Sequence, residues 1–223
     1  MEAYQAAFVD LLVRHQVLRF GDFTLKSGRR SPYFVNAGQL RTGAAIGGLG
    51  EAYAAAILRH QLPCDLIFGP SYKGVPLAVA TATALAGQGH DVAFTFDRKE
   101  AKDHGEGGIF VGQPPQAGMR VVLVDDVVTS GMSIREAVAL LRKTAEVTVS
   151  GVIVAVDRQE RGRGSKTTVA ELAEELDLPV LPIVTIREVV DYLDDREVDG
   201  QRIIDDAHRS AIDAYLRAHS GAA

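Results

Sequence analysis

The segment Val121-Val-Leu-Val-Asp-Asp-Val-Val-Thr-Ser-Gly-Met-Ser-Ile-Arg135 joins an apolar run to two carboxylates and then to a short, hydroxyl-rich turn. Val121–Val124 are β-branched or aliphatic, as a strand buried on both faces of a parallel sheet requires. Apolar residues then recur at helical spacing, at Ile134, Val138 and Leu141. The segment therefore predicts a strand, a loop and a helix. Its loop falls at the carboxyl end of the strand, where open α/β sheets bind their ligands.

The residue types in this loop suit a phosphorylated sugar. The carboxylates of Asp125 and Asp126 accept hydrogen bonds from O–H donors, so they can hold ribose hydroxyls or a metal-bound diol. Thr129–Ser133 supply hydroxyls, a glycine that lets the backbone approach a ligand, and the N–H groups of the following helix, which together favour a phosphate monoester. The alternative is structural: Ser130 or Ser133 only caps the helix, and the two aspartates are solvated.

The loop resembles the 5-phosphoribosyl-1-diphosphate (PRPP) signature of the type I phosphoribosyltransferases. Three further segments resemble those of one family in that group, the orotate phosphoribosyltransferases: Phe20–Phe34, Phe68–Pro76 and Arg98–Gly108. The resemblance runs in matching order from about Phe20 to Leu193. It implies transfer of the 5-phosphoribosyl group from PRPP to N1 of orotate, which gives orotidine 5′-monophosphate and pyrophosphate in de novo pyrimidine biosynthesis.

The resemblance also implies which residues contact PRPP. The catalytic groups would be Lys73, Lys102, Asp125 and Asp126. The PRPP-binding set would comprise Lys26, Tyr72, Lys73, Arg98, Lys99, Lys102, His104, Asp125, Asp126, Val127, Val128, Thr129, Ser130, Gly131, Met132 and Ser133. The structural alternatives are an exposed lysine in a Gly-flanked turn for Lys26, and the start of a helix for Tyr72 and Lys73. Met132 departs from the family pattern, because a threonine often stands there.

The residues at the base end follow from the same resemblance. Phe34 would stack on the orotate ring, Val35 would contact it through its main chain, and Thr129 would contact its polar edge. Arg158 would place its guanidinium fork on the orotate carboxylate. Val35 departs from the family pattern, because many relatives carry a second aromatic there. The alternatives are a core aromatic for Phe34 and a solvated residue of the loop 157–166 for Arg158.

The segment Arg98–Gly108 lacks apolar periodicity and ends in glycines, so we expect a mobile loop. Its cations would neutralise the charge that builds on the departing pyrophosphate. The alternative is a surface loop with solvated charges, because acidic residues are interspersed among the basic ones. By resemblance, the loop reaches into the active site of a neighbouring subunit, which implies a homodimer.

Composition fits this enzyme class. The chain has 223 residues, of which 47% are hydrophobic, so it can bury a substantial core. Its formal charge of −5 argues against a general nucleic-acid binder. The single cysteine excludes an internal disulfide, and no signal-peptide pattern or apolar run near 18 residues is visible, so we expect a cytoplasmic protein without a membrane partner. Mg²⁺ is the expected cofactor. It would be held by substrate oxygens and waters, so we assign no residue as a metal ligand.

The alternating pattern along the chain predicts a central, mainly parallel sheet covered by helices on both faces, and the change to a Gly- and aromatic-rich segment over 20–38 marks a small N-terminal lobe. The resemblance implies that this is the type I phosphoribosyltransferase fold, with the small lobe as its hood. We expect one domain, with an N-terminal helix and hood over 1–40, an α/β core over 41–194 and a C-terminal helix within 195–223. Strands are predicted over 65–69, 91–97, 120–125, 149–156 and 180–185. Helices are predicted near the N-terminus and over 43–60, 74–87, 132–143, 169–176, 186–194 and about 205–218.

Three other functions compete with this hypothesis. A purine-base phosphoribosyltransferase would share the Asp125–Ser133 signature but not the Arg98–Gly108 segment. A PRPP-responsive regulator that binds nucleic acid would add a basic face or a helix-turn-helix segment, and neither is visible. A dinucleotide-binding oxidoreductase is suggested by Gly48-Leu-Gly50, but Tyr53 replaces the third glycine and no apolar strand precedes it. No GxxxxGK[ST] run indicates a nucleoside triphosphatase.

Overall fold

The computed structural model describes residues 1–25, 28–102 and 108–222, and its centre is a six-stranded sheet. The strand order is β5-β4-β3-β6-β7-β8, and every neighbouring pair is parallel except β4 with β5. The strands are β3 (Leu66–Phe68), β4 (Ala93–Lys102), β5 (Gly108–Gly112), β6 (Arg120–Val127), β7 (Thr148–Asp157) and β8 (Val180–Thr185). The mainly parallel sheet predicted from the sequence is confirmed, with an antiparallel edge strand in addition.

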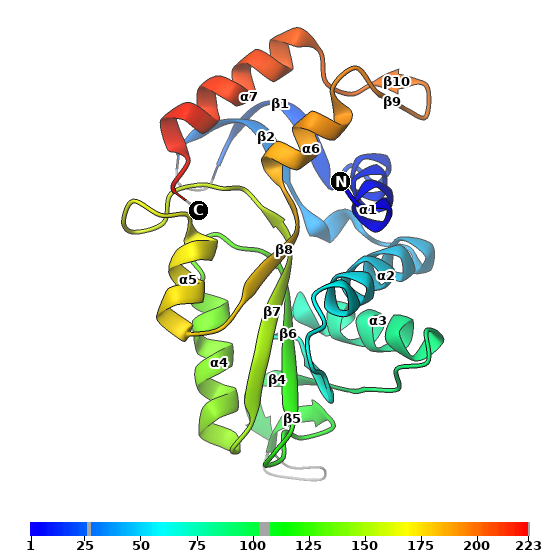
Figure 1. The fold of residues 1–223 in the computed structure, drawn as a ribbon, viewed down its shortest axis with the longest axis vertical. Coiled ribbons are helices and arrows are strands. Elements are labelled where there is room, and N and C mark those ends of the chain that lie inside the picture. The colour runs from blue at the N-terminus through cyan, green and yellow to red at the C-terminus, as the bar shows by residue number, and fades with distance from the viewer. Residues whose placement is uncertain (26–27, 103–107, 223) are drawn as a thin grey trace.

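Helices cover both faces of this sheet (Figure 1). One face carries α1 (Ala3–Arg14), α2 (Gly43–Arg59) and α3 (Gly74–Gly87), and the other carries α4 (Met132–Thr144) and α5 (Thr168–Leu176). Strand β6 shows why the apolar run is needed: Val122 and Val124 belong to the core on the first face, whereas Val121 and Leu123 belong to the core on the second. Because successive strand residues alternate between faces, a strand buried on both faces is apolar throughout.

A smaller lobe lies at one end of the sheet (Figure 1). It contains the antiparallel hairpin of β1 (Leu18–Thr24) and β2 (Arg30–Val35), a 3₁₀ turn at Ala37–Gln39, α6 (Ile186–Leu193), the short pair β9 (Glu197–Val198) and β10 (Gln201–Arg202), and α7 (Asp206–His219). The rings of Tyr33 on β2 and Tyr215 on α7 meet edge to face, with centroids 5.7 Å apart. The β1–β2 hairpin (the hood hairpin) therefore packs against α7 above the carboxyl ends of the strands.

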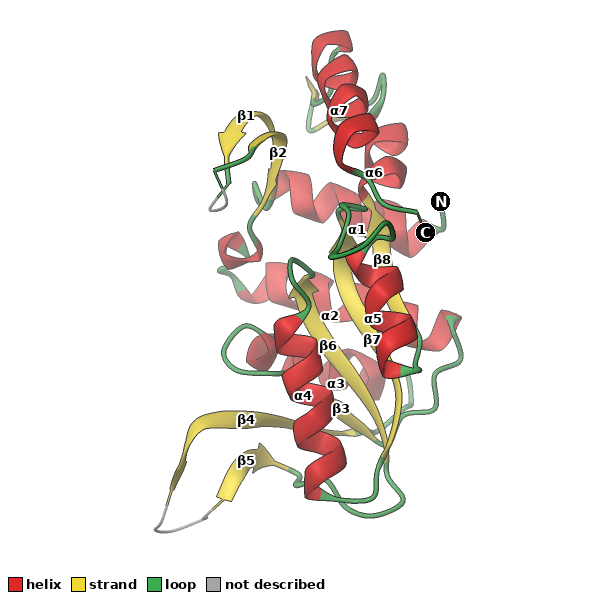
Figure 2. Ribbon diagram, turned by 90° about the vertical axis from the view of Figure 1, so that its left-hand side faces the viewer, coloured by secondary structure: helices red, strands yellow, loops and turns green. Residues whose placement is uncertain are grey.

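The segment from Arg98 corrects one prediction. A mobile loop was expected over 98–108, but β4 continues through Lys102 and pairs antiparallel with β5, which the sequence pattern did not predict. Figure 2 shows β4 and β5 projecting away from the sheet. Beyond Thr95, where the pairing of β3 with β4 ends, none of the described side chains of β4 and β5 is fully buried, and no apolar alternation marks the outer half of this hairpin as a strand. Residues 103–107 lie outside the described residues.

None of the described helices is long and apolar enough to cross a membrane. The predicted helices and the five predicted strands are present within a few residues of the expected bounds.

Candidate active site

A cavity of about 750 Å³ opens at the carboxyl ends of β6 and β7. Its walls come from the hood hairpin, the turn before α3, the loop between β6 and α4, and the loop after β7. Many of the residues assigned from the sequence line it: Phe34, Val35, Tyr72, Lys73, Asp125, Asp126, Val127, Val128, Thr129, Ser130, Ser133 and Arg158. Residues far apart in the sequence therefore meet in one cavity, at the edge of the sheet where α/β folds bind ligands.

The two adjacent carboxylates occupy the floor of the cavity and have different partners. Asp126 accepts a hydrogen bond from Nζ of Lys73 at 2.5 Å, and Asp125 accepts one from the hydroxyl of Ser133 at 2.8 Å. The buried hydroxyl of Tyr53 on α2 donates to the backbone carbonyl of Asp125 at 2.7 Å, which fixes the end of β6 from below. Both aspartates are buried, at 7% and 6% exposure. Burial raises the pKa of Asp125, and the neighbouring Asp126 carboxylate raises that pKa further.

This raised pKa predicts that Asp125 reduces stability. Above the folded-state pKa the carboxylate is ionised and poorly solvated, and below the unfolded value of 3.8 the penalty vanishes because both states are protonated. We expect Asp125→Asn to raise the free energy of unfolding at pH 7, because the amide is neutral at every pH and carries no buried charge. The gain should shrink as the pH falls through the folded-state pKa. Urea denaturation at several pH values measures it, and a variant less stable than the wild type at pH 7 would contradict the prediction.

The loop after the acidic pair ends in a tight turn at the N-terminus of α4. Gly131 adopts the left-handed conformation with φ 73°, and a Cβ there would lie 2.7 Å from a methyl carbon of Leu172. The loop is also fixed from outside, because Nη1 of Arg135 donates to the carbonyl of Ser130 at 2.7 Å. Helix α4 begins at Met132, directly after the turn. Unpaired N–H groups and the dipole at a helix N-terminus favour a phosphate.

The opposite end of the cavity is aromatic and basic. Phe34 is partly exposed and packs beside Phe23, with ring centroids 5.6 Å apart, so it is not simply a core residue. Arg158 is 8% exposed, and its guanidinium lies over the Tyr33 ring, 4.9 Å from the centroid. Nε and Nη2 of Arg158 donate to one oxygen of Glu160 at 2.9 and 2.5 Å. The structure therefore excludes the alternative that Arg158 is a solvated loop residue.

Some assigned residues lie elsewhere. Gly131, at the end of the turn, and Met132, the first residue of α4, do not line the cavity. Arg98 and Lys99 line an adjoining hollow together with Tyr72, and Nζ of Lys99 lies 5.7 Å from the centroid of the Tyr72 ring. Two assigned residues, Lys26 and His104, lie outside the described residues, as does the side chain of Lys102.

The cavity also contains residues that the sequence analysis missed. The charged ones are Arg29, Asp157, Glu160 and Arg161. Burial raises the pKa of Asp157. A signal existed for three of them, because the sequence from Asp157 to Arg161 places charges at the carboxyl end of the buried strand β7, just as Asp125 and Asp126 lie at the carboxyl end of β6.

Comparisons with known proteins agree with this geometry. Residues 36–183 match the model of the phosphoribosyl transferase domain. The chain is 47% identical over 217 residues to the orotate phosphoribosyltransferase of Photorhabdus laumondii, covering 96% of this chain and 97% of that protein. It is 50% identical over 193 residues to the orotate phosphoribosyltransferase of Marinobacter nauticus, covering 86% and 90%. The crystal structure of the orotate phosphoribosyltransferase of Francisella tularensis superposes with a TM-score of 0.83 at 33% identity, covering 96% and 99%.

Proposed function

Because the chain belongs to the orotate phosphoribosyltransferase family, we propose that it transfers the 5-phosphoribosyl group of PRPP to N1 of orotate. The products are orotidine 5′-monophosphate and pyrophosphate, in de novo pyrimidine biosynthesis. One observation supports this most strongly: a single cavity has an acidic pair and the turn before α4 on one side, and a partly exposed phenylalanine and a buried arginine on the other. The first side suits phosphoribose, and the second suits a flat ring that carries a carboxylate.

The reaction replaces the bond from ribose C1 to pyrophosphate with a bond from C1 to N1 of orotate. Pyrophosphate leaves with the electron pair, and orotate loses its N1 proton. Because the anomeric carbon becomes oxocarbenium-like, catalysis depends on positioning and on charges around the leaving group. We assign Asp125 and Asp126 to the ribose hydroxyls, the 129–133 turn to the 5′-phosphate, and Lys73 to the pyrophosphate. Nζ of Lys73 lies 2.5 Å from Oδ2 of Asp126, so PRPP must compete with this ion pair.

We assign Mg²⁺ as the cofactor. Among the described residues, no group of three or more His, Cys, Asp or Glu side chains is arranged to hold a metal ion. Among the oxygen ligands that line the cavity, the adjacent carboxylates of Asp125 and Asp126 suit an ion that would be held mainly by the oxygens of PRPP. When bound, Mg²⁺ would neutralise charge on the pyrophosphate.

A direct assay tests the proposed function. Purified protein is mixed with PRPP, Mg²⁺ and orotate, and the loss of the ultraviolet absorbance of orotate is followed. We expect turnover that requires both PRPP and Mg²⁺. No turnover of orotate, together with turnover of hypoxanthine, adenine or uracil, would assign the chain to another base.

We further propose that the chain acts as a homodimer. A second hollow of about 1160 Å³ lies between α1, α2 and α3, and its lining is mostly apolar and small. Val75 and Pro76 line both this hollow and the one beside Arg98 and Lys99. A second copy that covers the apolar hollow would therefore approach the base of the β4–β5 hairpin. The single-domain organisation and the cytoplasmic location stay predictions.

Complementation between two inactive variants tests the shared site. If the 98–108 segment serves the neighbouring subunit, a heterodimer of Lys102→Ala and Asp125→Asn contains one doubly defective site and one intact site. Equal mixing after mild denaturation gives about half heterodimer, so we expect about a quarter of the wild-type activity. Differently tagged chains confirm that heterodimers form. Continued inactivity of confirmed heterodimers would show that the segment acts within its own chain.

A further inference from the structure

The partly buried Glu160 connects three parts of the chain at the base end of the cavity. Its Oε1 accepts hydrogen bonds from Arg158 and from the hydroxyl of Tyr215 on α7, the latter at 2.7 Å. Its Oε2 accepts a bond from Nη1 of Arg29 at 2.9 Å, which comes from the hood hairpin. Arg158 and Glu160 are only two residues apart in sequence, so their contact with each other does not fix their position in the fold. That position depends on the contacts of Glu160 with Arg29 and Tyr215.

Tyr215 is linked to Arg158 through two other residues, Glu160 and Tyr33. Its hydroxyl holds Glu160, and its ring packs edge to face on Tyr33, over which the Arg158 guanidinium lies. Burial raises the pKa of Tyr215, so its hydroxyl keeps its proton and remains a donor at neutral pH. A residue of the last helix therefore restrains both the carboxylate and the aromatic surface that contact Arg158.

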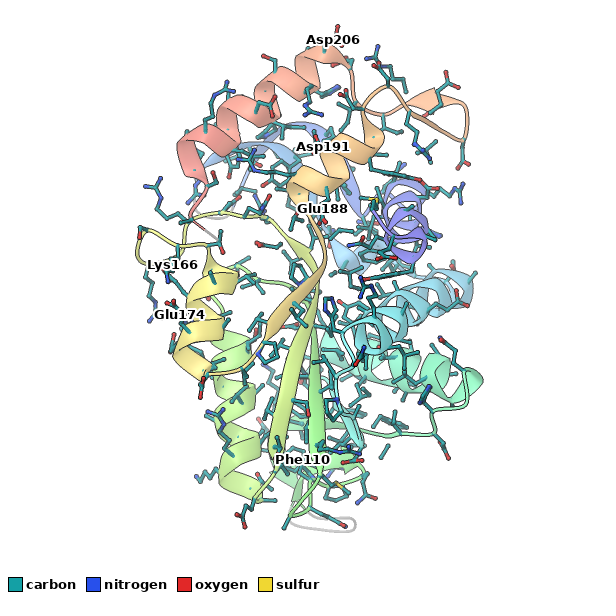
Figure 3. All side chains as sticks on the ribbon, viewed as in Figure 1. Phe110, Lys166, Glu174, Glu188, Asp191 and Asp206 are labelled. Atoms are coloured by element: carbon teal, nitrogen blue, oxygen red, sulfur yellow. The ribbon has the colours of Figure 1, made fainter. Side chains whose placement is uncertain are left out.

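The backbone after α7 restrains the same loop. The N–H groups of Arg161 and Thr167 donate to the carbonyls of His219 and Ala222 at 2.9 and 2.7 Å. From the other side, Lys166 forms an ion pair with Glu174 of α5, and Figure 3 shows these two side chains close together. The loop that carries Glu160 is thus fixed between α5 and the C-terminal segment.

The charges match a base that carries one carboxylate. Arg29, Arg158 and Arg161 line this end of the cavity with Asp157 and Glu160, so at least one positive charge is left uncompensated. Glu160 contacts the Nε and Nη2 side of the Arg158 guanidinium, which leaves Nη1 outside this contact. An arginine whose fork is fixed before binding loses less conformational entropy when a ligand arrives.

We propose that Glu160 and Tyr215 are positioning residues of the orotate site: Tyr215 holds the Glu160 carboxylate, which in turn orients Arg158 toward the carboxylate of the base. The C-terminal helix then contributes to base recognition, although Tyr215 itself does not line the cavity. This inference rests on the proposed function and adds to it the residues that set the affinity for the base.

The test compares steady-state constants for both substrates in Tyr215→Phe and Glu160→Gln. Tyr215→Phe deletes one oxygen and keeps the ring contacts, so we expect the KM for orotate to rise about fivefold, a modest effect for an indirectly acting hydrogen bond. Glu160→Gln should raise the KM for orotate about tenfold or more, because a charged partner of Arg158 is lost. The KM for PRPP and kcat should stay within about twofold in both variants, as expected for lost ground-state binding.

Tyr192→Phe is the matched control. The Tyr192 hydroxyl on α6 also contacts a carboxylate and an arginine, Asp10 and Arg196, but away from the cavity, so both KM values should be unchanged. Absence of orotate turnover by the wild type would refute the proposed function itself. With an active wild type, an unchanged or lowered KM for orotate in Tyr215→Phe would overturn the positioning role. Equal rises in both KM values would also overturn it, since general loosening would explain them.

Discussion

Replacing both carboxylates, Asp125→Asn with Asp126→Asn, should abolish productive use of PRPP while leaving the protein folded. Both side chains lie on the floor of the cavity, and one of them already contacts Lys73. Hydrogen bonds to charged groups contribute about 1.5–3 kcal/mol each, so losing two predicts a fall in kcat/KM for PRPP of about 10³-fold. Asparagine keeps the size of the side chain, and relief of the buried charge at Asp125 should preserve stability.

Asp194→Asn with Asp195→Asn is the matched control, because it removes the same two charges from an adjacent pair in the smaller lobe. Those carboxylates pair with Arg209 and Arg202. We expect near-normal kinetics from it. The affinity for PRPP is measured by calorimetry in the presence of Mg²⁺. Near-normal binding by a folded variant that lacks both Asp125 and Asp126 carboxylates would remove them from the PRPP site.

Arg158→Ala should raise the KM for orotate about 100-fold and change the KM for PRPP by less than about threefold, since truncating one partner of a buried charge pair costs about 2–5 kcal/mol. Glu160 keeps Arg29 and Tyr215 as partners in this variant, so the loop should hold its shape. Arg158→Lys should recover little affinity, because an ammonium lacks the planar fork.

Arg187→Ala, at an exposed position of α6, is the control for loss of one positive charge. Its kinetic constants should match those of the wild type. If Arg158→Ala weakened both substrates equally, Arg158 would not belong to the base end of the cavity.

The best-predicted part of the fold is the strand, loop and helix around the acidic pair. Strand β6 is buried on both faces and is therefore apolar from Val121 to Val124, and the helical spacing of Ile134, Val138 and Leu141 marks the buried side of α4. These signals are local, so the sequence carries them without knowledge of the tertiary structure. The predicted loop from Arg98 was wrong over its first part because a hairpin that projects from the sheet has no buried face to impose a pattern.

The hydrogen-bond network around Glu160 could not be predicted from the sequence, because its members are distant along the chain. Glu160 lies 131 residues after Arg29 and 55 residues before Tyr215, and each of the three is unremarkable by itself. Only the fold brings the hood hairpin, the loop after β7 and α7 together. Arg158 was assigned from the resemblance alone, because nothing in its local sequence distinguishes a buried arginine from a solvated one.

A crystal structure of the protein with orotidine 5′-monophosphate tests the placement of both substrates most directly. We expect the phosphate within hydrogen-bond distance of the backbone of residues 129–133, and the ribose hydroxyls at Asp125 and Asp126. The base should lie beside Phe34 with its carboxylate on Arg158, and Glu160 should still contact both Arg158 and Tyr215. A nucleotide bound in the reverse direction, or a base carboxylate that does not contact Arg158, would contradict the account.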